Sequence, residues 1–97
     1  MHGGVIVLEI NVHDYSLAHI ARIVEDNDAK IWCCYVSSPV DSAKIEVTLK
    51  INQTDLTSII RSFHRYGYFV KASHQGHNRH EDILRSHYDQ FMLYLNV

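Results

Sequence analysis

The sequence contains little proline, no long apolar run and no excess of charge of either sign. Because only one residue is proline and 46% are hydrophobic, the composition argues against a disordered tail or a linker. A formal net charge of −2 provides no broad electrostatic attraction for nucleic acid or for an anionic membrane. Apolar runs such as Val5 to Leu8 are far too short to span a bilayer, and no leader with a small-residue cleavage site is recognisable. A cytoplasmic location is therefore expected by default.

Motifs for catalysis are also missing. The sequence has no glycine-rich phosphate loop, no Cys-x-x-Cys pair and no nucleophile elbow. His13 and Asp14 are suitable types for an acid/base pair, but no nucleophile or oxyanion-stabilising turn accompanies them. A turn residue beside a helix cap is therefore the favoured interpretation. We expect a protein that is not an enzyme and that has no cofactor.

The common metal ligands do not form a recognisable metal site. Cys33 and Cys34 are adjacent, so on a strand they point to opposite faces and cannot easily bridge each other. We expect one to be a small core residue and the other a surface thiol. Three of the eight histidines recur at every third position in the loop 74–80, but this spacing alone does not make them converge on a metal. A solvated, partly protonated loop is favoured over a zinc or nickel site.

The clearest structural signal lies in the middle of the chain, where the apolar pattern changes its period. Residues 45–51 alternate strictly between apolar and polar, which predicts a strand with one buried face. A stripe at helical spacing follows, formed by Leu56, Ile59, Ile60 and Phe63. Thr54 or Asp55 is expected to cap this helix. Gly67 is expected to end it in the left-handed conformation.

The first half of the chain repeats this strand–helix–strand pattern. Residues 5–12 predict a first strand, and 12–16 predict a turn in which Asp14 or Ser16 caps the next helix. That helix is expected over 17–27, with Asn27 left-handed at its end. Its apolar stripe consists of Leu17, Ile20, Ala21 and Val24. A second strand over 30–37 and a hairpin loop over 37–42 follow.

The complete order of elements predicts the fold class. Residues 68–73 predict a fourth strand with Tyr68, Val70 and Ala72 on its core side, and 81–95 predict a third helix. We therefore expect an α+β, ferredoxin-like βαββαβ sandwich with an additional C-terminal helix, in one domain over 1–97. The strands are expected in the spatial order fourth, first, third, second, with both main helices on one face. The second strand is then an edge, where an interface is expected at Trp32, Cys34 and Val36.

The sheet face away from the helices is expected to be apolar at one end and charged over the rest. Val5 and Val7 form the apolar end, and Glu9 is expected to pair with a lysine on a neighbouring strand, the candidates being Lys44, Lys50 and Lys71. Coverage of the valines by the last helix or by a second copy of the domain is favoured over an exposed patch.

A small basic and aromatic cluster lies on the second predicted helix. It consists of Arg61, His64, Arg65 and Tyr66. RNA-binding domains of the same fold stack bases on aromatic residues of the sheet, and the outward strand positions here carry no such aromatic pairs. Nucleic-acid binding is therefore not expected.

Several segments carry a resemblance to a known family, and together they cover nearly all of the chain. They are GVIVLEINVHDYSLAHIARIVE, LAHIARIVEDNDAKI, YVSSP, IEVTLKINQTDL, RYGY and YLNV. The helix-to-strand passage resembles ACT domains, which are small-molecule-binding regulatory domains. More closely, the whole chain resembles the C-terminal ACT-like domain found after a pair of cystathionine-β-synthase-type (CBS) domains. These segments are mostly core patterns, so they indicate lineage better than activity.

The resemblance implies a non-catalytic regulatory domain, expected to be a fragment of a longer CBS-domain protein. It implies a homodimer, formed through the edge strand or the sheet face, that controls the attached CBS domains. ACT domains often bind an amino acid at the turn after the first strand. By position, the implied ligand-binding residues are Asn11, His13, Asp14, Tyr15 and Ser16, supplemented across the interface by Trp32 and Cys34.

This chain departs from the family at the centre of that turn. Tyr15 stands where the family usually has a glycine, and its side chain occupies room that the family leaves for the ligand. The expected ligand is an amino acid or a nucleotide-like molecule, whose carboxylate or phosphate the helix N-terminus favours. The alternative is a purely structural dimerisation module without a ligand.

Overall fold

The structure is a computed structural model that describes residues 3–38 and 42–75. Its elements, in chain order, are β1 (Gly4–Asn11), a 3₁₀ turn η1 (Val12–Asp14), α1 (Leu17–Glu25), β2 (Ile31–Ser37), β3 (Lys44–Ile51), α2 (Thr57–Arg65) and β4 (Phe69–His74). The helix expected over 81–95 and most of the histidine loop 74–80 lie outside the described residues. None of the described helices is long and apolar enough to cross a membrane.

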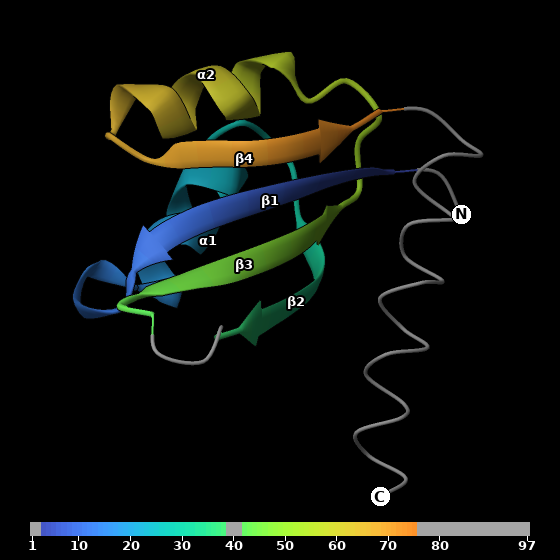
Figure 1. Cartoon of the computed structure of the whole chain (residues 1–97). Coiled ribbons are helices and arrows are strands. Elements are labelled where there is room, and N and C mark those ends of the chain that lie inside the picture. The colour runs from blue at the N-terminus through green and yellow to red at the C-terminus, as the bar shows by residue number, and fades with distance from the viewer. Residues whose placement is uncertain (1–2, 39–41, 76–97) are drawn as a thin grey trace, which may run out of the picture.

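The four strands form one antiparallel sheet in the order β2-β3-β1-β4. The two central strands, β1 and β3, pair without interruption from Gly4 opposite Ile51 to Asn11 opposite Lys44. Strands β2 and β4 are the edges, as Figure 1 shows. The described chain is therefore an α+β domain with an antiparallel sheet and two helices, which is broadly compatible with a ferredoxin-like arrangement.

Both helices cover the same face of the sheet, and the hydrophobic core lies between them and the strands (Figure 1). The alternation in β1 and β3 sends every second residue into this core, because successive side chains of a strand point to opposite faces. The core residues from these two strands are Ile6, Leu8, Ile10, Ile45, Val47, Leu49 and Ile51. Helix α2 contributes Ile59 and Phe63, and Leu56, which precedes it, is also fully buried. The stripe predicted for this helix is thus confirmed, with Ile60 half-buried beside it.

Helix α1 is shorter than predicted and begins with an exposed residue. It ends at Glu25 instead of residue 27, and Asp28, with φ at +58°, takes the left-handed conformation that was expected for Asn27. Asn27 instead uses its side-chain amide to bond back to the carbonyl oxygen of Ile23 at 2.8 Å. Leu17, predicted in the apolar stripe, leaves 46% of its surface exposed because it lies in the first turn, at the end of the core.

Both ends of α2 confirm what was predicted for them, with Asp55 as the residue that caps the first turn and Gly67 as the residue that ends the helix. Leu56 occupies the N-cap position and makes no side-chain cap bond. Asp55 nevertheless accepts a hydrogen bond from the backbone amide of Thr57 at 3.1 Å, and this bond lowers the pKa of its carboxyl group. Gly67 has φ at +85° and follows the helix as predicted.

Each edge strand contains a β-bulge, and the bulge in β4 overturns a predicted side-chain direction. In β4 the register shifts so that Val70 lies opposite Leu8, but Ala72 lies opposite Val7. Residues directly opposite each other share a face, so Ala72 points away from the core and not into it as predicted. In β2 the register shifts between Ile31 and Cys33. The simple alternation predicted for residues 68–73, with Ala72 on the core side, is therefore wrong.

Candidate functional site

The turn after β1 is built by its own polar side chains. Strand β1 ends at Asn11, one residue before the predicted end, and Val12 is 47% exposed and not part of the buried strand face. Asn11 accepts a hydrogen bond from the backbone amide of His13 through its side-chain oxygen at 3.0 Å, which starts the 3₁₀ turn. The amide of Val12 donates to the carbonyl oxygen of Ala43 at 2.8 Å, which ties the turn to the start of β3.

The second polar side chain of this turn is also committed to the backbone. Ser16 is the N-cap of α1, and its hydroxyl oxygen accepts from the backbone amide of His19 at 3.2 Å. Of the two capping residues that were predicted as alternatives, Ser16 is the one used. Asn11 and Ser16 thus stabilise the turn and the helix end, while His13 and Asp14 remain exposed.

Tyr15 joins the turn to the edge strand β2. Its side chain is half-buried and packs against the core, beside Cys34. Burial is the main cause that raises the pKa of both the Tyr15 phenol and the Cys34 thiol. The structure therefore brings one predicted ligand-binding residue close to one predicted interface residue, and both pack against the core.

A histidine and two tyrosines next to this turn form a cluster that the sequence did not indicate. The hydroxyl of Tyr68 is hydrogen-bonded to Nδ1 of His19 at 2.9 Å. The His19 ring meets Tyr66 edge to face, with ring centroids 5.3 Å apart, and Tyr68 meets Phe63 in the same way at 5.4 Å. Burial raises the pKa of Tyr68, and the negative charge of Asp14 adds to this effect.

Sequence patterns carried only a weak signal for this cluster. His19 lies beside the apolar stripe of α1, where a histidine is usually solvated, and Tyr68 was predicted simply as a core residue. The contact joins the first turn of α1 to the residue before β4, and no local pattern predicts a pairing between residues so distant in the chain.

The edge strand β2 exposes apolar side chains that nothing in the described chain covers. Trp32 is 50% exposed and Val36 is 43% exposed. Cys33 is exposed, whereas Cys34 is half-buried and packs against the core, as expected for one surface thiol and one core residue. Cys34, which was also predicted as an interface residue, lies on this edge strand opposite Leu49, a core residue of β3.

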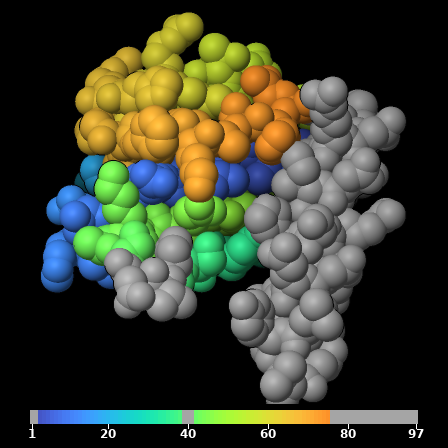
Figure 2. Space-filling view, in the orientation of Figure 1, coloured from blue at the N-terminus to red at the C-terminus, as the bar shows by residue number. Residues whose placement is uncertain are grey.

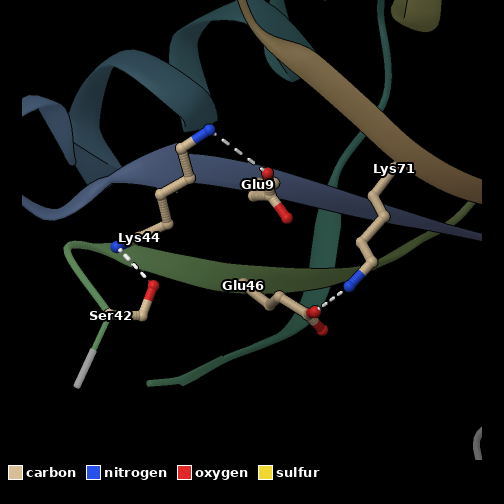
Figure 3. A network of polar contacts seen from close by, with 5 residues as sticks. All are labelled: Glu9, Ser42, Lys44, Glu46 and Lys71. Atoms are coloured by element: carbon tan, nitrogen blue, oxygen red, sulfur yellow. Dashed lines mark hydrogen bonds and ion pairs between the residues drawn. The ribbon is translucent and has the colours of Figure 1, made fainter. Parts of the chain in front are cut away.

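Two ion pairs cross the sheet on the face away from the helices (Figure 3). Lys44 lies 3.5 Å from Glu9, which is one of the three pairings predicted for Glu9. Lys71 on β4 donates to the carboxylate of Glu46 on β3, and this hydrogen bond and its charge raise the pKa of Lys71. Both pairs are partly open to water, so each contributes little to stability.

The opposite end of this outer face is closed to solvent. Figure 2 shows the outer face, with the side chains of β4, β1 and β3 across it. Val5 is fully buried and Val7 is 8% exposed, although both lie outside the core cluster beneath the helices. Their neighbours on β3, Lys50 and Thr48, are 7% and 3% exposed. The outer face is therefore buried at its valine end and open at its charged end.

The described residues offer no metal centre. Within 3–38 and 42–75, no group of three or more His, Cys, Asp or Glu side chains converges in a way that could hold an ion. Comparison of the chain with protein-family models and with curated proteins found no match.

Proposed function

We propose that this chain is an ACT-like regulatory domain of ferredoxin-like fold that has no catalytic activity, forms a homodimer and controls an attached pair of CBS domains. The observation that carries the proposal is the open edge of the sheet. Strand β2 pairs with β3 on one side only, and it carries the exposed side chains of Trp32 and Val36. An edge strand with unpaired backbone groups and apolar side chains favours the addition of another strand.

The dimer follows from the symmetry of such an edge. Two copies of β2 that pair antiparallel around a two-fold axis at Cys34 place Trp32 opposite Val36 of the second copy. Each large exposed side chain then meets an apolar neighbour, and the sheet continues from one copy into the other. A tryptophan at the centre of an interface commonly contributes much of the binding energy.

The edge is a better candidate for the interface than the outer face of the sheet. Val5 and Val7, the apolar residues of that face, are already buried. The rest of the face carries Glu9, Glu46 and their lysine partners, which would have to be desolvated in a complex.

Regulation requires that the ligand bind the two arrangements of the attached domains with different affinity. The proposed ligand position is the turn formed by Asn11, His13, Asp14, Tyr15 and Ser16, next to the proposed dimer interface. One observation favours the alternative, a structural dimerisation module without a ligand. Asn11 and Ser16 are already used as caps, and Tyr15 packs against the core, so within the described residues only His13 and Asp14 have side chains at this turn without such a role.

Replacement of Trp32 tests the dimer. Sedimentation equilibrium of the wild-type chain is expected to give a dimer, and Trp32→Lys is expected to give a monomer. Phe69→Lys is the matched control, because Phe69 is 60% exposed on the other edge strand, β4. A wild-type monomer at all accessible concentrations, or equal loss of the dimer in both variants, would refute the proposed interface.

Calorimetry tests the ligand separately from the dimer. Amino acids and adenine nucleotides are titrated into the wild-type chain and into Asp14→Asn. Binding that Asp14→Asn weakens supports sensing at the turn. If the wild-type chain is a dimer and no titrated compound gives a heat different from that of buffer, the structural module is the correct alternative.

A further inference from the structure

A polar groove runs between the two helices. Its volume is about 330 Å³, which falls within the range of small-molecule sites. Its lining residues are Ile23, Asp26, Asn27, Ser58, Arg61, Ser62, Arg65 and Tyr66. Apart from Ile23, each of these residues has a polar or charged side chain. The groove shares no residue with the turn after β1 or with β2.

Two arginines one helical turn apart supply the positive charge of this groove. Arg61 and Arg65 lie at i and i+4 on α2, where like charges repel each other. Neither forms an ion pair or a hydrogen bond within the part of the chain that the structure describes. Asp26 is the only carboxylate among the described residues that line the groove, so two positive charges face one negative charge there. Two such unpaired guanidinium groups are suited to a doubly charged anion.

The floor of the groove is held in place by a hydrogen bond between the helices. Asn27 donates from its side-chain nitrogen to the carbonyl oxygen of Ile23 at 2.8 Å and to the hydroxyl oxygen of Ser62 at 3.2 Å. Because Ser62 accepts this bond through its oxygen, its own hydroxyl hydrogen is available to donate to a ligand. Ser58 lies one turn earlier on α2 and adds a second hydroxyl.

Tyr66 supplies a flat apolar surface at the end of α2 where Arg65 lies. It is 56% exposed and lines the groove. Its T-shaped contact with His19 uses at most one face of the ring, so another face can stack against a planar group.

From these contacts we propose that the groove between α1 and α2 binds a small phosphomonoester that carries a planar ring, such as a nucleoside monophosphate. Arg61 and Arg65 bind the phosphate dianion, Ser58 and Ser62 donate hydrogen bonds to it, and Tyr66 stacks on the ring. Asp26 opposes the anion and limits the affinity. The inference is independent of the proposed dimer and of the proposed site at the turn.

The test is calorimetric titration of the full 97-residue chain with adenosine 5′-monophosphate at low salt and pH 7.5, where the phosphate is a dianion. Arg61→Gln and Arg65→Gln are each expected to weaken binding about tenfold or more, because each removes a charge-assisted hydrogen bond. Asp26→Asn is expected to strengthen it a few-fold. Arg22→Gln is the matched control, because Arg22 is an arginine of α1 outside the groove, and it leaves the affinity unchanged.

Adenosine and ribose 5-phosphate separate the two halves of the proposed ligand. Both are expected to bind more weakly than adenosine 5′-monophosphate. In Tyr66→Ala the difference in affinity between adenosine 5′-monophosphate and ribose 5-phosphate is expected to be smaller than in the wild type. The proposal is overturned if adenosine 5′-monophosphate does not bind, if adenosine binds equally well, or if Arg61→Gln and Arg65→Gln bind like the wild type. Binding that only Asp14→Asn weakens assigns the ligand to the turn and removes it from the groove. Thermal melting by circular dichroism verifies that every variant is folded.

Discussion

The contact between Gly4 and Leu56 gives the sharpest test of the packing described above. A Cβ atom added to Gly4 would lie 2.6 Å from Cδ1 of Leu56 and 2.7 Å from its Cγ. Leu56 is fully buried, so it cannot move aside into solvent. Gly4→Ala therefore overpacks the core and is expected to lower the free energy of unfolding by about 1–3 kcal/mol.

A second substitution shows whether this cost comes from Leu56. Leu56→Ala alone leaves a cavity and is expected to lower the free energy of unfolding by about 2–5 kcal/mol. It also removes the atoms that the methyl group added by Gly4→Ala would meet, so Gly4→Ala should cost little in the Leu56→Ala background. The free energy of unfolding of the double variant is then expected to be about 1–2 kcal/mol higher than the value obtained by adding the effects of the two single substitutions.

Gly67→Ala is the control for this double-mutant cycle. A Cβ atom at Gly67 meets nothing within 4 Å, but φ at +85° disfavours alanine by about 1–2 kcal/mol. Gly67 and Leu56 lie at opposite ends of α2, roughly 15 Å apart along its axis. Their combination should therefore be additive. Urea denaturation of all the variants measures the cycle, and additivity of Gly4→Ala with Leu56→Ala would refute the proposed contact.

Two further predictions concern the neighbourhood of the turn after β1. Tyr68→Phe removes the hydrogen bond to His19 and should lower the free energy of unfolding by about 0.5–1.5 kcal/mol. Tyr66→Phe is the control and should lower it by less than about 0.5 kcal/mol, because the exposed Tyr66 hydroxyl makes no hydrogen bond within the described chain. Equal effects of the two substitutions in urea denaturation would contradict this prediction. Mass spectrometry after brief alkylation at pH 8 should find Cys33 modified before Cys34, because burial raises the pKa of the Cys34 thiol. The raised pKa means that the folded chain disfavours the Cys34 thiolate, so the contribution of the neutral thiol to the free energy of unfolding is present below the ordinary pKa of 9.0 and decreases as the pH rises above it. Equal alkylation of both cysteines would show that Cys34 is not protected.

Apolar periodicity predicted the elements of this domain because each element buries one regular face. The strict alternation of residues 45–51 corresponds to a central strand, and the stripe that starts at Leu56 corresponds to α2. The fold class could be stated for the same reason. Edge strands were predicted less well, since a single extra residue in a bulge reverses the direction of the side chains that follow it. The error at Ala72 has this origin.

Side chains of the candidate site could be located by position but not assigned a role. Asn11 and Ser16 are residue types that bind ligands and also cap turns, and only the distances show that both cap. Arg61 and Arg65 were visible as neighbours on one helix. Their groove depends on Asn27, which follows α1 and donates a hydrogen bond to Ser62 on α2. The sequence of either helix alone does not predict such a contact between them.

The central position of β1 affects how the chain becomes structured during synthesis. Of the strands in this sheet β1 leaves the ribosome first, yet its pairing partners, β3 and β4, are made later, and Ile51 must emerge before Gly4 can pair with it. The hairpin of β2 and β3 is local and can form without it. A nascent chain that stops before β3 therefore exposes an apolar strand with two open edges, which is the segment that a chaperone would be expected to protect.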